Sequence, residues 1–172
     1  MTVPANRSRP VQATPSGSSR ALVALFRACL AYMVVGVASG LFYREFTKAN
    51  DFAEGQFTQL GVVHTHLLTL GFIVLLIVLV LEKVFVLSHS PKLFTWFFWL
   101  YNAGVVLTAA MMVWHGSLTV LGRESTAMIA GIAGLGHMLV TAGMIVFFVL
   151  LGRAIGRQSV PVPEAEQVGA AA

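Results

Sequence analysis

Residues Phe57–Leu81 read FTQLGVVHTHLLTLGFIVLLIVLVL, and this stretch decides the fold class because it is largely apolar and carries no Asp, Glu, Lys or Arg. A helix needs about 20 mainly apolar residues to cross ~30 Å of hydrocarbon, so the stretch is long enough to span a membrane. Its apolar residues are continuous, whereas the strands of a membrane barrel alternate. We therefore expect a membrane-spanning helix that holds two histidines.

Three further stretches of the same kind lie around it, at Ala21–Tyr43, Phe94–Gly116 and Thr126–Leu151. The connections between the stretches are short, which favours antiparallel neighbours in sequence order. The predicted fold is thus all-α, an integral membrane four-helix up-down bundle with spans at about 21–43, 57–81, 94–116 and 126–151.

The composition excludes other classes of protein. The chain has 172 residues, of which 57% are hydrophobic and 10% charged, whereas about 25% of a soluble domain is charged. So few charges cannot cover a soluble surface, and so much apolar character excludes disorder over most of the chain. The one cysteine, Cys29, has no partner for a disulfide within the chain.

The positive charges predict the orientation of the bundle. Cytoplasmic flanks of membrane spans are enriched in Lys and Arg. One side of the predicted bundle carries eight such residues (Arg7, Arg9, Arg20, Arg27, Lys83, Lys92, Arg153, Arg157) and the other carries three (Arg44, Lys48, Arg123). We expect both termini in the cytoplasm, a disordered cytoplasmic segment at 1–20, the transmembrane domain at 21–152 and a cytoplasmic tail at 153–172. The net charge of +4 is then explained by the positive residues that orient the protein in a cell membrane. No nucleic-acid partner is predicted.

Histidines are the candidate functional residues, because titratable groups inside a span are costly. His64, His66 and His137 lie within predicted spans, His115 lies at the outer rim, and His89 lies in a cytoplasmic loop. At ~1.5 Å per residue, His64 and His66 lie roughly 10–14 Å from the outer end of their span and His137 roughly 16 Å from that of its own. Because the second span is predicted to end at Leu81, no Asp, Glu or Lys is expected deep in a span.

The surroundings of these histidines suggest what they could bind. His64 and His66 are about 200° apart around a helix, so they cannot hold one small ion together but can serve two centres. Ala133 and Gly134 lie one turn before His137; such small residues leave room for a flat macrocycle and also permit close helix packing. Arginines pair well with carboxylates, so Arg44 and Arg123 at the outer rim could meet the propionates of a haem.

The string His64–Gly71, HTHLLTLG, resembles one in small bacterial membrane proteins related to subunit I of the haem–copper oxidases. With Tyr43–Lys48 (YREFTK) and the Tyr101-Asn102-x-Gly104 pattern, residues 25–150 also resemble an uncharacterised bacterial four-helix family. The oxidase resemblance implies haem binding, since in the large oxidases His-x-His ligates two haems. It does not imply oxygen reduction by this chain alone, because four spans cannot rebuild the three-histidine copper site. Phe72 also stands where the oxidase-like proteins often have Trp.

The leading hypothesis is a b-type haem held between the second and fourth spans, with His66 or His64 paired with His137. Arg44 or Arg123 would meet the propionates. The role would be electron transfer, haem handling or redox sensing beside a respiratory-chain partner, and no residue is predicted to be catalytic.

Two alternatives remain open at this stage. Imidazoles also suit copper and other transition metals, which His64, His66 and His115 could bind, with His137 as a further candidate ligand. The chain could instead be a cofactor-free accessory subunit of a membrane complex, in which histidines only tie helices together. Association into a homo-oligomer is compatible with each hypothesis.

Overall fold

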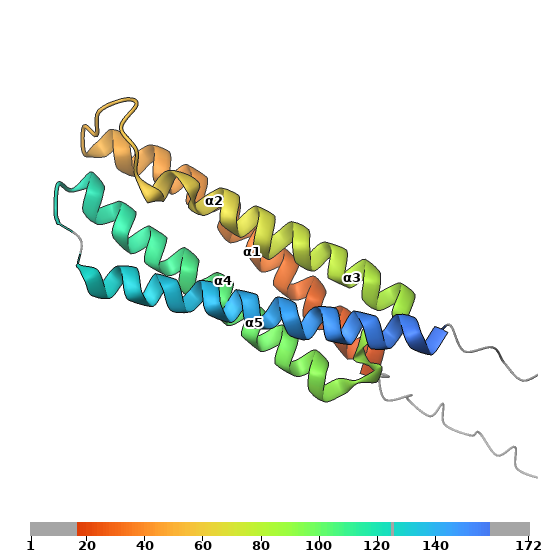
Figure 1. Ribbon diagram of the computed structural model, residues 1–172. Helices are drawn as coiled ribbons and strands as arrows, with labels where there is room; N and C mark the ends of the chain where they lie inside the picture. The colour runs from red at the N-terminus through yellow and green to blue at the C-terminus, as the bar shows by residue number, and fades with distance from the viewer. Residues whose placement is uncertain (1–16, 125, 159–172) are drawn as a thin grey trace, which may run out of the picture.

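The computed structural model describes residues 17–124 and 126–158, and within them the chain is a bundle of helices without strands (Figure 1). Four helical stretches are long and apolar enough to cross a membrane, so the predicted fold class is confirmed. In chain order the elements are α1 (Gly17–Ala49), η1 (Gln59–Val62), α2 (Val63–His66), η2 (Leu67–Ile73), α3 (Val74–Phe85), η3 (Leu87–His89), α4 (Pro91–Val120) and α5 (Ala127–Gln158). The second span is the continuous run from η1 to α3.

The helices are longer than the predicted spans. α1 begins at Gly17, so residues 17–20 are helical although they were placed in the disordered segment. α5 continues to Gln158, into the predicted tail. The apolar run marks only the part of a helix that can lie in hydrocarbon, and backbone hydrogen bonding can continue past it among polar residues. The remainder of both predicted terminal segments lies outside the described residues.

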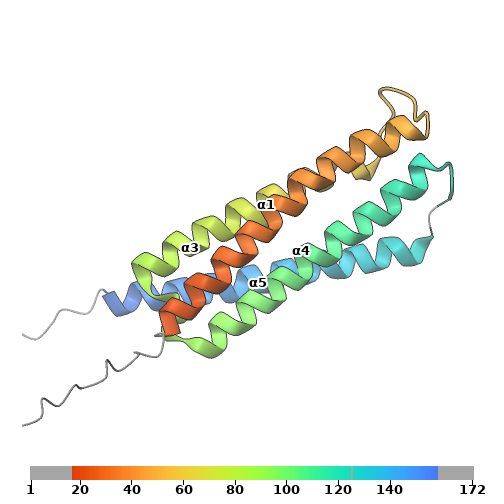
Figure 2. The same cartoon turned by 180° about the vertical axis from the view of Figure 1, so that it is seen from behind.

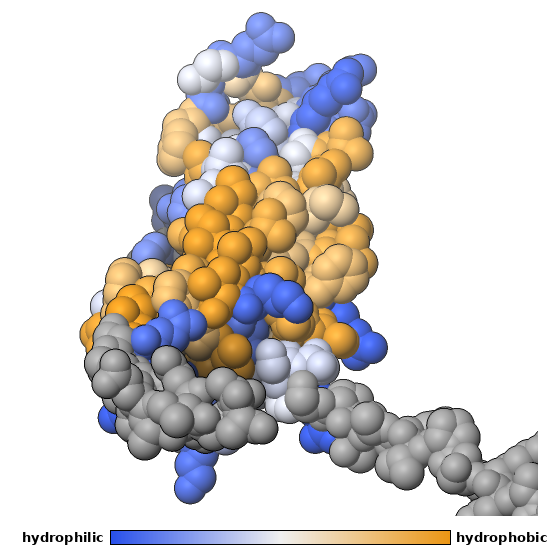
Figure 3. All heavy atoms as spheres, turned by 90° about the vertical axis from the view of Figure 1, so that its right-hand side faces the viewer, coloured by the Kyte–Doolittle hydropathy of each residue, from blue (hydrophilic) through white to orange (hydrophobic). Residues whose placement is uncertain are grey.

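The surface of the bundle fits a lipid environment. Large apolar side chains such as Phe26, Trp99 and Ile145 are about 60% exposed. Figure 3 shows one face of the molecule, with a band of hydrophobic side chains between hydrophilic ends. A soluble protein rarely exposes so extensive an apolar surface, which supports a multi-pass membrane protein.

The bundle consists of two helix pairs. α1 packs along α2, η2 and α3, and α4 packs along α5, while η1, α2 and η2 also contact α4. Figure 2 shows α1 and α4 as the helices nearest to the viewer, with α3 and α5 behind them. The second span contacts both α1 and α4, whereas α5 contacts mainly α4. α1 and α5 therefore lie at opposite edges of the bundle.

Glycines set the closest approaches of the helices. A Cβ atom on Gly104 of α4 would lie 2.6 Å from the backbone nitrogen of Val140 and 2.8 Å from the carbonyl oxygen of Gly136, both in α5. In the other pair, Gly36 of α1 packs against Leu68 and Gly40 packs against His64. Small residues let helices in a membrane approach closely without a hydrophobic driving force. The Gly36–Gly40 spacing therefore marks a contact between helices of the same chain.

The second span widens into a π-helix at η2, Leu67–Ile73, where a regular α-helix was expected. A π-helix shifts the hydrogen bonds of the backbone, and other groups can then bond its carbonyls. The Tyr101 hydroxyl of α4 donates to the carbonyl oxygen of Leu70 at 3.0 Å. The Cys29 thiol of α1 contacts the carbonyl oxygen of Phe72 at 3.9 Å. Side chains from both neighbouring helices thus hold η2 in place.

Replacing Tyr101 by phenylalanine is expected to lower the free energy of unfolding by about 1 kcal/mol, because it removes one buried hydrogen bond and leaves the Leu70 carbonyl without that donor. Thermal unfolding in detergent, followed by circular dichroism, measures the change. Tyr43→Phe is the matched control, since Tyr43 is half-buried against Gly61 without a recorded hydroxyl bond. Equal effects of the two changes would contradict the role given to the Tyr101 hydroxyl.

Glu82 lies just beyond the predicted end of the second span, in the last turn of α3, and it is buried inside the bundle. It follows Leu75 and Val78 on the buried face of α3, and its side chain is 0% exposed. One carboxylate oxygen accepts the backbone N–H of Ser88 at 2.9 Å, and the other accepts the Ser88 hydroxyl at 2.5 Å. Between these residues Val86 adopts a left-handed conformation (φ 50°) that ends α3. The carboxylate thus holds the turn into α4.

Replacing Glu82 by alanine is expected to lower the free energy of unfolding by about 2 kcal/mol, because two donors of Ser88 lose their acceptor. Lys83→Ala is the control, since Lys83 is the next residue along α3 and is exposed. Its effect should stay within about 0.5 kcal/mol. If Glu82→Ala unfolds at the same temperature as Lys83→Ala, the carboxylate does not stabilise the turn.

Candidate functional site

Two of the candidate histidines have the same hydrogen-bond arrangement. Nδ1 of His66 lies 3.0 Å from the carbonyl oxygen of Val62, and Nδ1 of His137 lies 3.0 Å from that of Ala133. A carbonyl oxygen only accepts, so each Nδ1 is the donor, and in a neutral ring the Nε2 then keeps its lone pair. Backbone bonds of this kind orient the imidazoles that ligate metals in proteins. His66 and His137 are thus two imidazoles with fixed rings and free Nε2 atoms.

His66 lies on the side of α2 that faces away from α1. His64, about 200° around the helix, is the residue that packs against Gly40 of α1. Leu70 follows His66 by one turn, and its carbonyl receives the Tyr101 hydroxyl of α4. His66 therefore points away from α1, and it lines a small pocket with Thr65, Thr69 and Leu70 of the same span.

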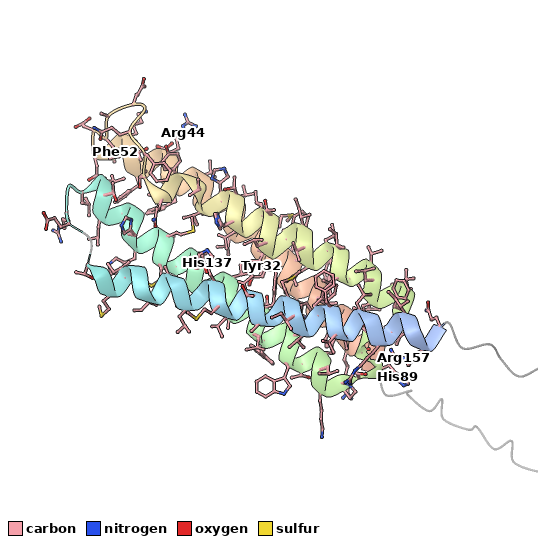
Figure 4. The ribbon with its side chains drawn as sticks, viewed as in Figure 1. Tyr32, Arg44, Phe52, His89, His137 and Arg157 are labelled. Atoms are coloured by element: carbon pink, nitrogen blue, oxygen red, sulfur yellow. The ribbon has the colours of Figure 1, made fainter. Side chains whose placement is uncertain are left out.

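His137 lies on α5. Its neighbour Gly136 faces α4, where a Cβ atom would meet the Thr108 side chain. His137 is the next residue along α5 and lies about 100° around the helix from Gly136. Its side chain therefore does not face α4 directly. Figure 4 places it on the side of α5 that faces α2 and α3. Its side chain is exposed, and that of His66 is half-buried.

The two rings also lie at a similar level along α4. Leu60 packs on Gly116, and the Leu70 carbonyl bonds to Tyr101, so His66 lies between these two contacts. In α5, Gly136 packs on Thr108 and Val140 on Gly104. His137 lies between those contacts in sequence, and therefore within the same middle part of α4.

The part of the second span that carries His66 does not pack against α5 in the described residues. α5 packs on α4, and near its end it contacts α3 and η3, while α2 and η2 pack on α1 and α4; no comparable contact joins α2 or η2 to α5 among the described residues. A pocket of about 250 Å³ opens beside the His66 ring, lined by Thr65, His66, Thr69 and Leu70. Tyr101 of α4 lies on the inner side of this region. Its backbone packs on Gly143 of α5, and its hydroxyl donates to the Leu70 carbonyl of the second span. The residues that line this pocket all belong to the second span, and we call the region that extends from it toward His137 of α5 the α2–α5 cleft.

The remaining histidines lie elsewhere. His64 faces α1, and His115 lies in α4 next to Gly116; Nδ1 of each is buried without a hydrogen-bond partner in the described part of the chain. His89 is exposed at the opposite end of the bundle (Figure 4). Where a histidine ring nitrogen has a recorded bond, the bond stays within its own helix. The described histidine bonds therefore do not tie one helix to another.

Neither arginine predicted to meet a propionate is bound at the cleft. Arg44 is exposed near the end of α1, as Figure 4 shows, and its Nε lies 3.7 Å from Glu45 Oε1. Arg123 is exposed in the connection between α4 and α5, where its backbone N–H donates to the Leu118 carbonyl. Arg44 lies near the end of α1 and Arg123 in the connection from α4 to α5, at the same end of the bundle (Figure 1).

The three-histidine copper site is not assembled. Within residues 17–124 and 126–158, no three His, Cys, Asp or Glu side chains come close enough to hold one metal ion. His64 faces α1 whereas His66 faces away from it, as their angular separation predicts.

Sequence reasoning missed Glu82 as a buried residue. Tyr101 is expected from the sequence to pack and to form hydrogen bonds, since a buried tyrosine usually needs a partner for its hydroxyl, and the structure gives this partner as the Leu70 carbonyl. Glu82 was left outside the span because the count of apolar residues ended before it. Its spacing from Leu75 and Val78 could have placed it on the buried face.

Comparison with known proteins identifies the family. The family described as "Protein of unknown function (DUF2871)" matches residues 22–154, and the chain belongs to it. This agrees with the predicted membership of an uncharacterised family, and no similarity to an oxidase is found. No curated protein and no solved structure matches the chain.

Proposed function

We propose that this member of the DUF2871 family binds a b-type haem in the α2–α5 cleft, with His66 and His137 as its two axial ligands. The observation that carries the proposal is the shared state of these imidazoles: each donates Nδ1–H to a carbonyl of its own helix and leaves Nε2 free. Imidazole nitrogens are common protein ligands of haem iron, and two such rings at a similar level of the bundle would hold it.

The residues around the two histidines suit the porphyrin ring of the haem. Leu70 and Thr69 line the pocket at His66, and Ala133 and Gly134 leave space one turn from His137. The absence of direct packing between α2 and α5 allows a flat group to lie between them. Arg44 and Arg123 stay candidates for the propionates, since long arginine side chains can reach from the outer rim.

A haem held in this way would supply one-electron transfer, and the protein would set its environment. The Nδ1–H bonds of His66 and His137 would fix the orientations of the two rings. We infer a role in electron transfer, haem handling or redox sensing in a cell membrane, with both termini cytoplasmic and a respiratory-chain protein as the partner.

An absorption spectrum of the protein purified in detergent, with and without added haem, tests the proposal. We expect a Soret band and, after reduction, the visible bands of a haem with two imidazole ligands. Metal analysis of the same sample separates the alternatives. Stoichiometric copper without porphyrin would favour the transition-metal hypothesis, and a colourless, metal-free protein that takes up no haem would favour the accessory-subunit hypothesis.

A further inference from the structure

Charged residues are divided unevenly between the two ends of the bundle within residues 17–124 and 126–158. The end where α1 and α4 begin and α3 and α5 finish carries six exposed basic residues: Arg20, Arg27, Lys83, Lys92, Arg153 and Arg157. The acidic residue at this end, Glu82, is buried and bonded to Ser88. The opposite end has three basic residues and four acidic ones: Glu45, Asp51, Glu54 and Glu124. We call the first, strongly positive end the basic end.

A pocket of about 460 Å³ opens at the basic end, between the first turns of α1 and α4. Figure 2 shows the beginnings of these two helices close together. Three polar side chains line the pocket: Arg20 of α1, Ser88 of η3 and Thr95 of α4. The rest of the lining is mainly small or aromatic, and includes Ala24 and Trp99. We call this hollow the basic-end pocket.

The cations at this pocket are available for an anion. Arg20 lines the pocket, and Lys92 lines a neighbouring hollow that shares Thr95 with it. Both basic side chains are exposed, and the ion pair recorded among the described residues lies at the opposite end. The hydroxyls of Ser88 and Thr95 already donate to acceptors of the protein. An anionic group in the pocket would therefore be met by Arg20 and Lys92, and both side chains bind phosphate well.

Two exposed tryptophans indicate the level of the pocket in a membrane. Trp96 and Trp99 lie in the second and third turns of α4 and are 63% and 65% exposed. Tryptophan is enriched where hydrocarbon meets the headgroups of a bilayer. Arg20 and Lys92 lie in the first turns of their helices, on the water side of these tryptophans. Cation, tryptophan and apolar surface thus follow one another in the order of the phosphate, glycerol and acyl chains of a phospholipid.

We propose that the basic-end pocket binds a phospholipid with a net negative headgroup. Its phosphate is held by Arg20 and Lys92, and its glycerol and first acyl carbons lie against Phe94 and Trp99. A zwitterionic phospholipid offers the same phosphate, but its ammonium group meets no exposed carboxylate at this end of the described chain. Basic clusters beside membrane spans attract anionic lipids. The inference goes beyond the haem proposal and does not depend on it.

Quenching of tryptophan fluorescence by brominated lipid tests the proposal. In full-length protein with Trp114→Phe, the remaining tryptophans are Trp96 and Trp99. Vesicles of phosphatidylcholine and phosphatidylglycerol, with either lipid brominated, give the binding constant of the anionic lipid relative to the zwitterionic one. We expect a constant well above one. Arg20→Gln and Lys92→Gln should each lower it roughly fivefold, the effect of one basic residue near an anionic lipid.

Matched controls separate the pocket from the overall charge. Lys83→Gln and Arg153→Gln remove the same charge from exposed positions of the basic end that do not line this pocket, and each should change the constant less than about twofold. Ala24→Phe fills the apolar part of the pocket without changing the charge and should abolish the preference. The exposed control Ala38→Phe should keep it.

Several outcomes would overturn the proposal. Equal losses in Arg20→Gln and Arg153→Gln, or an unchanged preference in Ala24→Phe, would show attraction by the overall charge without a site. Displacement of the brominated lipid by excess inorganic phosphate would assign the pocket to a soluble anion. His66→Ala should leave the lipid preference unchanged, so a failure of the haem proposal is distinguishable from a failure of this one.

Discussion

Replacing His137 by alanine is expected to remove the Soret band of the haem-reconstituted protein, or to reduce haem retention at least tenfold. The substitution deletes one of the two Nε2 atoms proposed to hold the iron, and an exposed residue of α5 contributes little to packing, so the protein should still fold. His66→Ala should have the same effect, because the two imidazoles act on opposite faces of one group. Absorption spectra at equal protein concentration measure the loss.

The chain provides matched controls for this prediction. His89→Ala removes an exposed histidine at the other end of the bundle and should leave the spectrum unchanged. His64→Ala removes the ring that packs on α1, on the other side of α2. Its haem content should stay close to that of the unchanged protein.

Rescue separates a ligand from a structural residue. Imidazole added to the His137→Ala protein should restore the Soret band, since the free ligand can occupy the space of the deleted ring. A structural role would not respond to imidazole. If His137→Ala and His66→Ala both retain a normal spectrum, the haem lies elsewhere and the assignment of the α2–α5 cleft is wrong.

Replacing Gly104 by alanine is expected to lower the free energy of unfolding by about 2 kcal/mol, within the usual range for overpacking a tight interface. The added Cβ would lie 2.6 Å from the backbone nitrogen of Val140 and 2.8 Å from the carbonyl oxygen of Gly136. Backbone atoms cannot turn aside as a flexible side chain can, so α4 and α5 must separate. Thermal unfolding in detergent measures the cost.

Gly134→Ala in α5 is the matched control. A Cβ atom there would meet nothing within 4 Å, so this change should be neutral, or stabilising by a few tenths of a kcal/mol through the better helix propensity of alanine. Because Gly104 lies close to the level of His137, Gly104→Ala should also weaken haem retention. Equal stability of the two glycine variants would contradict the tight approach of α4 and α5.

Much of the fold follows from local sequence, and less of the site does. Continuous apolar runs such as Phe57–Leu81 predict spanning helices because their length is matched to the thickness of hydrocarbon. The helices extend beyond the apolar runs, to Gly17 and Gln158, because backbone hydrogen bonding does not stop where apolar residues do. The burial of Glu82 depends on the turn that brings Ser88 back to it, and no composition window contains that information.

The sequence by itself determined the class of the protein, its four spans, and the divergence of His64 and His66. These properties depend on residue type and on the fixed geometry of one helix. Only the tertiary structure decided that His64 packs on Gly40 of α1, and that η2 widens to offer the Leu70 carbonyl to Tyr101. The physical reason is that these relations arise from the rotation and level of one helix against another. Glycines such as Gly40, Gly104 and Gly116, packed against partners distant in the chain, set that arrangement.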